Sequence, residues 1–188
     1  MEFPTKKYNI ILADPPWTYD DKCKSGDRGL GNKYDTMSIP QLMELPVETI
    51  AVDDCFLFMW VTYPLLQEGF QVMKAWGFEY KTVAFTWIKE TSNCKVFMGM
   101  GNYTRSNPEL VILGKKGKPN ILSHSVENYT RSKIGKHSQK PDIIRKKIVQ
   151  LCGDLPRIEL FSRTKIHGWS TWGNDEKLDD KPLESFFE

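Results

Sequence analysis

Five short apolar runs, separated by segments with helical periodicity, constrain the fold of this 188-residue chain more than any other feature of its sequence. The runs are bounded by turn-forming residues and cover Tyr8–Ala13, Cys55–Thr62, Val83–Lys89, Glu109–Gly114 and Arg157–Ser162. Most of them lack the apolar and polar alternation of a half-exposed strand, which is typical of strands that are covered on both faces. They therefore predict the buried strands of a mainly parallel sheet.

Three segments between these runs are expected to be helical, namely Pro40–Ile50, Pro64–Trp76 and Asp142–Cys152. The last has the clearest pattern, because Ile144, Ile148 and Leu151 recur at helical spacing and a glycine follows. Strands that alternate with helices predict an α/β domain. The remaining long segments are expected to be loops that either carry function or are partly disordered, namely Thr18–Thr36, Ser92–Asn107 and Lys115–Gln139.

Length and composition indicate a single domain over residues 1–188, since 40% of the chain is apolar and 12% is aromatic. No apolar stretch is long enough to span a membrane and the N-terminus lacks the apolar core of a signal peptide, so we expect a cytoplasmic protein. The four cysteines form no C-x-x-C pair and the three histidines have no metal-ligand spacing, so neither a disulfide framework nor a metal site is expected.

Charge is unevenly distributed, although the net charge is only +2. Ten basic residues against two acids give the stretch from Lys115 to Lys147 a local charge of +8. Such a run is usually a solvated surface, but it also suits a track for phosphates, with Tyr103 and Tyr129 available to stack on bases. An acidic tail is expected at about residues 175–188.

The first apolar run ends in Ala13-Asp14-Pro15-Pro16-Trp17, in which an acid, two prolines and a tryptophan follow a buried strand. Two prolines stop sheet pairing and hold the chain extended. In parallel open sheets, ligands bind beyond the carboxyl ends of the strands, and Phe161-Ser162-Arg163 occupies the same position at the last run. We therefore expect the first and last of these strands to lie side by side and to border one crevice.

This order of residues suits methylation of an exocyclic amine on a nucleobase. The lone pair of such an amine is delocalised into the ring, so the amine must be held nearly tetrahedral before it reacts. Asp14 would accept one N–H and the main-chain carbonyl of Pro15 the other, with Pro16 fixing that carbonyl. Trp17 would offer a flat face to a flipped base. Catalysis would then depend on positioning and electrostatic fit.

The same residues also have a structural interpretation without any catalytic role. Asp-Pro-Pro can be a simple turn, Trp17 a core aromatic, and short motifs alone produce false matches. Lys140 can be a solvated lysine before a helix, and Arg163 a structural ion-pair partner.

The rest of the chain resembles the DPPW-type adenine-N6 methyltransferases, the MT-A-seventy family, and in particular its short bacterial and phage members. Besides Ala13–Trp17, the similar stretches are Tyr34–Met37, Phe56–Thr62, Asn102–Glu109, His137–Asp142, Ile158–Arg163 and Gly168–Asn174. The resemblance implies a Rossmann-like S-adenosylmethionine-dependent methyltransferase fold with helices on both faces of the sheet. It also implies a permuted order, in which the catalytic DPPW strand precedes the cofactor strand.

The resemblance further implies roles for individual residues. Catalysis would fall to Asp14, Pro15, Pro16 and Trp17. The residues expected at the S-adenosylmethionine site are Asp14, Lys140, Phe161, Arg163, Asn174 and Asp175; the last is shorter than the residue that relatives often have there. The residues that the resemblance places at the substrate entrance are Tyr103, Arg105, Asn107 and Glu109. Lys133 and Lys136, from the basic stretch, are also expected to bind the substrate.

The function that follows is transfer of a methyl group to the N6 amine of adenine in nucleic acid, with DNA favoured and RNA as the alternative. A homodimer, or a heterodimer with a related chain, is plausible because no separate target-recognition domain is evident. Two further alternatives remain: a non-catalytic subunit that grips nucleic acid, against which the intact Asp14–Trp17 motif argues, and methylation of a protein or small molecule, against which the basic stretch argues mildly.

Overall fold

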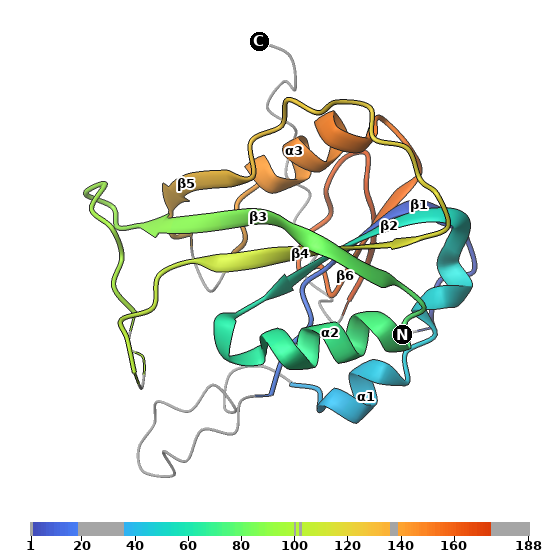
Figure 1. The fold of residues 1–188 in the computed structure, drawn as a ribbon, viewed down its shortest axis with the longest axis horizontal. Coiled ribbons are helices and arrows are strands. Elements are labelled where there is room, and N and C mark those ends of the chain that lie inside the picture. The colour runs from blue at the N-terminus through green and yellow to red at the C-terminus, as the bar shows by residue number, and fades with distance from the viewer. Residues whose placement is uncertain (1, 19–35, 100, 102, 136–138, 174–188) are drawn as a thin grey trace.

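The computed structural model describes residues 2–18, 36–99, 101, 103–135 and 139–173. Within these residues a seven-stranded sheet has the order β5-β3-β4-β2-β1-β6-β7 (Figure 1). The strands are β1 (Tyr8–Ala13), β2 (Ala51–Val61), β3 (Glu79–Glu90), β4 (Glu109–Lys116), β5 (Tyr129–Lys133), β6 (Arg157–Leu160) and β7 (Ser170–Trp172). Only β4 is reversed, because it is antiparallel to both β2 and β3 while all other neighbouring pairs are parallel. The expected mainly parallel sheet is confirmed.

Helices cover both faces of the sheet, as the sequence predicted. The helices are α1 (Ile39–Met43), the 3₁₀ turns η2 (Val47–Ile50) and η3 (Tyr63–Leu65), α2 (Leu66–Ala75) and α3 (Ile143–Cys152). Helices α1 and α2 pack on one face with Ile11 and Ala13 of β1, and α3 packs on the other face with Ile10 and Leu12 (Figure 1). Successive residues of β1 thus enter two different cores, which explains why this strand is apolar without alternation.

A buried ion pair fastens α3 to the sheet. The guanidinium of Arg145 donates through Nε and Nη2 to the two carboxylate oxygens of Glu159 on β6, and both distances are 2.7 Å. A third bond, also 2.7 Å, joins Nη1 of Arg145 to Asp142. Burial alone would lower the pKa of Arg145, but Glu159 outweighs it and raises that pKa. The pair therefore stays charged inside the protein.

Strands β1 and β6 lie side by side, with Ile10 opposite Arg157 and Ala13 opposite Leu160. The prediction that the first and last apolar runs are neighbours is therefore confirmed. Because the two strands are parallel, their carboxyl ends meet at one edge of the sheet. The reversed strand β4 begins at this same edge, since Leu110 pairs with Val61 at the end of β2. We call this edge of the sheet the carboxyl edge.

Several boundaries differ from the sequence prediction. The segment Lys115–Gln139 is not all loop, because it contains β5 and the end of β4, and β7 was not predicted. Strands β2 and β3 begin four residues earlier than expected, at Ala51 and Glu79. The added residues include the exposed Asp53 and Asp54 on β2 and the exposed segment Glu79–Thr82 on β3. The helix expected over Pro40–Ile50 is two elements, since α1 ends at Met43 and Pro46 precedes the 3₁₀ turn.

Other expectations concern membrane spans, metal sites and the C-terminal tail. In the described part of the chain, no helix is long and apolar enough to cross a membrane. Among the same residues, no cluster of three metal-ligating side chains is found. The acidic tail, Tyr34–Asp35 and the greater part of the segment Thr18–Thr36 lie outside the described residues.

Candidate active site

Asp14 stands at the carboxyl edge, directly after β1. Its backbone N–H donates to the carbonyl of Leu160 at 3.4 Å, which ties the ends of β1 and β6 together. The two prolines that follow are held in a fixed turn: the carbonyl of Pro15 accepts from the N–H of Trp17 at 2.8 Å, and that of Pro16 accepts from Met37 at 2.8 Å. The DPPW segment is thus rigid, as its prolines predicted.

The ammonium of Lys140 lies between two carboxylates at this edge. Its Nζ is 3.1 Å from Oδ1 of Asp14 and 3.0 Å from Oε2 of Glu109. It also lies 5.3 Å from the ring centroid of Trp60, at cation–π distance. Segments far apart in the sequence therefore meet here: the end of β1, the start of β4 and the residues before α3. The sequence predicted that Asp14 and Lys140 lie close together, and the structure brings them into direct contact.

Glu109 extends this charged cluster to β3. Its second oxygen, Oε1, lies 2.7 Å from Nζ of Lys89. The four side chains, Lys89, Glu109, Lys140 and Asp14, form a row of alternating charge and are only 14% to 24% exposed. Lys89 was not among the residues predicted for the site. The available signal was a lysine at the end of the apolar run Val83–Lys89, at the same edge as Asp14.

Partial burial and the neighbouring charges oppose each other in the pKa values of this row. Burial by itself lowers the pKa of Lys140, but Asp14 and Glu109 outweigh it and raise that pKa above its ordinary value. Burial likewise raises the pKa of Glu109, but Lys140 and Lys89 outweigh it and lower that pKa. Both groups are therefore charged at neutral pH, and the carboxyl edge presents an ammonium beside a carboxylate.

Trp17 is a core residue in the structure, contrary to the expectation of a stacking face. Its side chain is 8% exposed and packs in the same core as α1 and α2. Its indole N–H donates to the carbonyl of Trp60 at 3.2 Å. The structural interpretation of Trp17 is therefore supported, because a ring that is already covered cannot replace the stacking of a flipped base.

Phe161 follows Leu160, whose carbonyl accepts from Asp14, and the closing segment pairs with the other side of β6 through β7. Phe161 follows β6 with φ of 62°, a left-handed conformation that is strained for a non-glycine residue, and its ring centroid is 5.5 Å from that of Trp172. A Cβ on Gly173 would meet the carbonyl oxygen of Ser162 at 2.4 Å, so only glycine fits there. The two motifs predicted for the cofactor are thus adjacent. Arg163 is exposed, and Asn174 and Asp175 lie outside the described residues.

The residues predicted for the substrate entrance lie in different places. Glu109 belongs to the charged row. Tyr103 is fully exposed on the segment that joins β3 to β4, where Arg105 is also exposed. Lys133 is exposed at the end of β5, opposite Glu90 and therefore beyond the carboxyl edge. Lys136 lies outside the described residues.

Asn107, predicted to contact substrate, has a structural role in the protein. Its Oδ1 accepts from the N–H of Lys89 at 2.9 Å, and its Nδ2 donates to the carbonyl of Lys89 at 2.9 Å. The same Nδ2 also donates to the carbonyl of Phe97. Both amide hydrogens are therefore used within the protein, where they hold together the base of the segment between β3 and β4.

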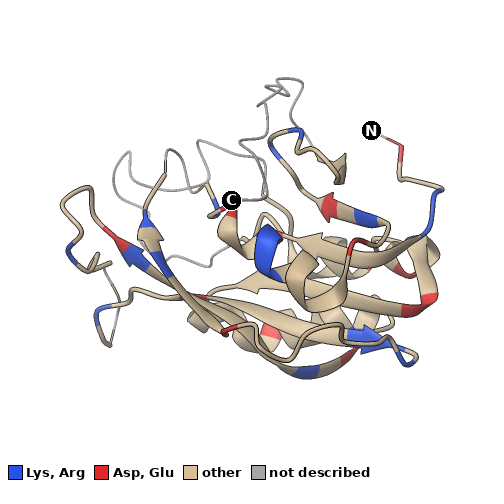
Figure 2. Ribbon diagram, turned by 90° about the horizontal axis from the view of Figure 1, so that it is seen from above, with Lys and Arg blue, Asp and Glu red and all other residues tan. Residues whose placement is uncertain are grey.

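The basic stretch from Lys115 to Lys147 does not form one track. In Figure 2 the basic residues lie in separate groups over the molecule. Lys115 and Lys116 end β4 at the edge opposite Asp14, and Lys118 follows them. Arg145 is buried against Glu159, and Lys147 donates to the carbonyls of Glu127 and Tyr129. A phosphate track can therefore use only part of this stretch, such as Lys133.

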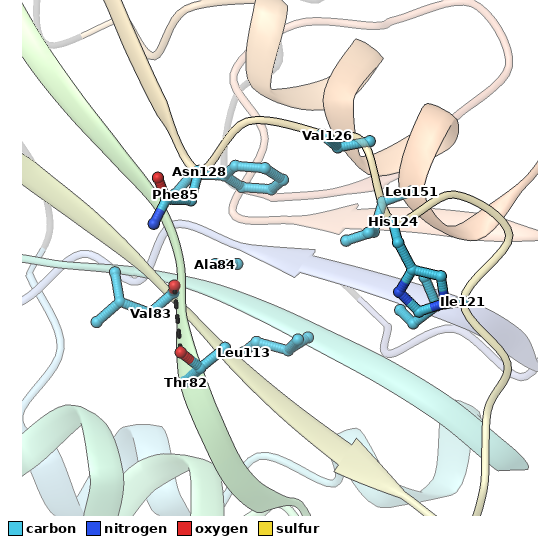
Figure 3. Close-up of a pocket in the computed structure, with 10 residues that line it drawn as sticks. All are labelled: Thr82, Val83, Ala84, Phe85, Leu113, Ile121, His124, Val126, Asn128 and Leu151. Atoms are coloured by element: carbon cyan, nitrogen blue, oxygen red, sulfur yellow. Dashed lines mark hydrogen bonds between the residues drawn. The ribbon is translucent and has the colours of Figure 1, made fainter.

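A separate open pocket of about 310 Å³ lies on the α3 face of the sheet (Figure 3). Thr82–Phe85 of β3, Leu113 of β4 and Leu151 of α3 line it, together with side chains from the segment between β4 and β5. It contains none of the residues predicted for catalysis, cofactor or substrate. The charged row at Asp14 brings together residues predicted for catalysis, cofactor and substrate, and it is the candidate active site.

The fold and the charged row together indicate the class of protein. A mainly parallel sheet with helices on both faces, and with a fixed acid after a central strand, is the architecture of a Rossmann-like methyltransferase domain. The model of the MT-A70 family matches residues 8–175. The chain belongs to the MT-A70 family and is a methyltransferase.

Three relatives illustrate this membership. The Type II methyltransferase M.MunI of Mycoplasma sp is 38% identical over 190 residues, which cover 92% of this chain and 79% of M.MunI. The N(6)-adenosine-methyltransferase MT-A70-like protein of Drosophila melanogaster is 28% identical, over 89% of this chain and 27% of its own length. The human N(6)-adenosine-methyltransferase catalytic subunit METTL3 is 27% identical, over 89% of this chain and 28% of METTL3. The chain thus spans most of M.MunI but less than a third of the two longer relatives.

Proposed function

We propose that this protein transfers a methyl group from S-adenosylmethionine to the exocyclic N6 amine of adenine in DNA. Membership of the MT-A70 family makes it an adenine-N6 methyltransferase. The proposal adds the donor, the polymer and the roles of individual residues. The observation that carries the assignment of residues is the contact of 3.1 Å between Asp14 and Lys140 at the carboxyl edge of the sheet.

The charged residues of the crevice fit the methionine end of the donor. That end carries an ammonium and a carboxylate, and the pair of Asp14 and Lys140 offers the opposite charge to each. The donor supplies an electrophilic methyl group on a sulfonium. Phe161 would border the donor beside Asp14, and Arg163, Asn174 and Asp175 remain proposed contacts to it.

Asp14 and the proline turn would orient the amine. The carboxylate of Asp14 accepts one N–H of the amine, and the carbonyl oxygen of Pro15 accepts the other. That oxygen already accepts the backbone N–H of Trp17 with one lone pair, and its second lone pair is available for the amine. The nitrogen lone pair is thereby directed out of the ring system. Since the turn is already fixed, little reorganisation is needed when the amine arrives. The methylated amine becomes acidic and loses its extra proton to water.

DNA is favoured over RNA by the comparisons. The Type II methyltransferase M.MunI has a higher identity with this chain, and matches it over a much larger share of its own length, than the two N(6)-adenosine-methyltransferases. RNA remains the second candidate because those two relatives match nearly the same part of this chain. Assembly as a homodimer, or with a related chain, is part of the proposal, as is placement in the cytoplasm.

The proposal is tested by incubating the protein with radiolabelled donor and a panel of adenine-containing oligonucleotides. The panel holds single-stranded DNA, double-stranded DNA and RNA of the same sequences, and nucleoside analysis follows. We expect label in N6-methyldeoxyadenosine. Label confined to RNA would reject the choice of DNA, and absence of both transfer and donor binding would favour the non-catalytic alternative.

Lys133 provides a test of where the nucleic acid lies. If Lys133 contacts a phosphate, Lys133→Gln should weaken binding of DNA about equally for all sequences. It should also reduce the slope of log affinity against log salt concentration by about 1, because one fewer counterion is released. Fluorescence anisotropy titrations at four salt concentrations measure this slope.

The matched control is Lys118→Gln, which removes an equally exposed charge beyond the end of β4, at the opposite edge of the sheet. Its slope should equal that of the unaltered protein. Equal losses in the two variants would show that DNA does not approach the carboxyl edge in preference to the rest of the surface.

A further inference from the structure

The row Lys89, Glu109, Lys140 and Asp14 connects the proposed catalytic acid to the end of β3. Each neighbouring pair is in direct contact, at 2.7 Å, 3.0 Å and 3.1 Å along the row. Lys140 therefore has two carboxylate partners, whereas Asp14 has only Lys140 among its described ion pairs. The contact with Lys140 uses Oδ1 of Asp14, and Asp14 becomes a stronger acceptor for an amine N–H when this contact loosens. Glu109 is the group that can then retain the ammonium.

Lys89 is the fixed end of this row. The side chain of Asn107 bonds both the N–H and the carbonyl of Lys89, at 2.9 Å each, so the backbone cannot shift. The ammonium lies 5.6 Å from the ring centroid of Trp87 and 6.0 Å from that of Phe97. These contacts restrain the side chain in addition to the backbone. Lys89 is thus a restrained cation aimed at Oε1 of Glu109.

We propose that Lys89 is a positioning residue for methyl transfer: it holds the carboxylate of Glu109 in place, so that Lys140 can pair with Glu109 while Asp14 turns to the amine. The inference rests on the proposed function, because it assigns Asp14 the role of amine acceptor. Lys89 itself contacts none of the reacting atoms. It acts through Glu109, whose two carboxylate oxygens are divided between Lys89 and Lys140.

The consequence of removing Lys89 follows from the charges that face Glu109. Partial burial favours the neutral acid, and the described cations that oppose it are Lys89 on β3 and Lys140 before α3. Loss of Lys89 therefore makes Glu109 easier to protonate. A protonated Glu109 leaves Lys140 paired with Asp14 alone, and the more tightly paired Asp14 is then a weaker acceptor for the amine. Activity should fall at a higher pH than in the unaltered protein.

The experiment compares Lys89→Met with Lys89→Arg in profiles of kcat/KM against pH, measured with the oligonucleotide that the unaltered protein methylates best. Lys89→Met should show an acid limb displaced to higher pH, with a loss of about tenfold for each pH unit below that limb. Lys89→Arg keeps the cation and should retain the limb of the unaltered protein. A purely structural ion pair at the end of a strand would change stability without moving the limb.

The matched control is Lys81→Met, which removes a lysine from the same strand, where it pairs with the exposed Glu79 at 2.5 Å outside the crevice. Its profile should overlay that of the unaltered protein. The inference is overturned if the Lys89→Met profile also overlays it, or if Lys89→Arg shares the displaced limb. If the unaltered protein transfers no methyl group to any oligonucleotide, it is the proposed function that fails.

Discussion

Asp14→Ala is expected to lower the rate of single-turnover methyl transfer by about 100-fold or more, because the amine loses the acceptor that holds one of its hydrogens. Donor affinity should weaken as well, since the ammonium of the donor would lose the carboxylate proposed to face it. The fold should survive, because the side chain of Asp14 is partly exposed and its backbone bond to Leu160 is retained. Rapid quench with radiolabelled donor measures the transfer step, and circular dichroism checks the fold.

The matched variant is Asp14→Asn, which keeps an oxygen acceptor and removes the charge. Its rate should fall between those of Asp14→Ala and the unaltered protein if hydrogen bonding to the amine is the main contribution of Asp14. Equal rates for Asp14→Ala and the unaltered protein would refute the assigned role outright.

Glu159→Gln should lower the free energy of unfolding by about 3 kcal/mol, because it leaves the buried guanidinium of Arg145 without its carboxylate partner. For a chain of this length, a loss of that size corresponds to a fall in Tm of roughly 10 °C. The remaining contact of Arg145 with Asp142 cannot compensate, since Asp142 is largely exposed. Urea titration followed by circular dichroism measures the change.

Two comparisons make this second prediction specific. The double variant with Arg145→Met and Glu159→Leu should be more stable than Arg145→Met alone or Glu159→Leu alone, because it leaves no buried charge unpaired. Glu79→Gln, which breaks an exposed ion pair on β3, should produce no measurable change. A Glu159→Gln protein as stable as the unaltered one would mean that the pair does not fasten α3 to the sheet.

The strands of the central sheet could be predicted because their sequences report burial. Ile10–Ala13 is apolar at every position, because its side chains enter the two cores in turn. A short apolar run of this kind is typical of a strand that is covered on both faces. The edge strands could not be predicted in the same way. Strand β5 has the sequence YTRSK and is exposed at every second residue, and β7 has three residues. Their pairing depends on a neighbouring strand that is distant in sequence, so local composition carries little signal.

The candidate site was predictable in part for the same reason. The neighbouring strands placed Asp14 near the last strand, and resemblance to a family pointed to Lys140. The ion pair of Glu109 with Lys89 could not be foreseen, because it depends on the register by which β4 pairs with β3. Trp17 was assigned to a base although it packs in the core, since aromatic residues serve both purposes and only the structure shows which face is covered.

The reversed direction of β4 would allow the protein to vary the substrate contacts proposed for Tyr103 and Arg105 without disturbing the charged row. Since β3 ends and β4 begins at the carboxyl edge, the connection between them projects outward from that edge (Figure 1). Residues can be inserted or exchanged at the tip of this connection while the paired strands keep Lys89 and Glu109 in register. Changes in the connection between β3 and β4 could therefore adapt the same fold to a new target sequence.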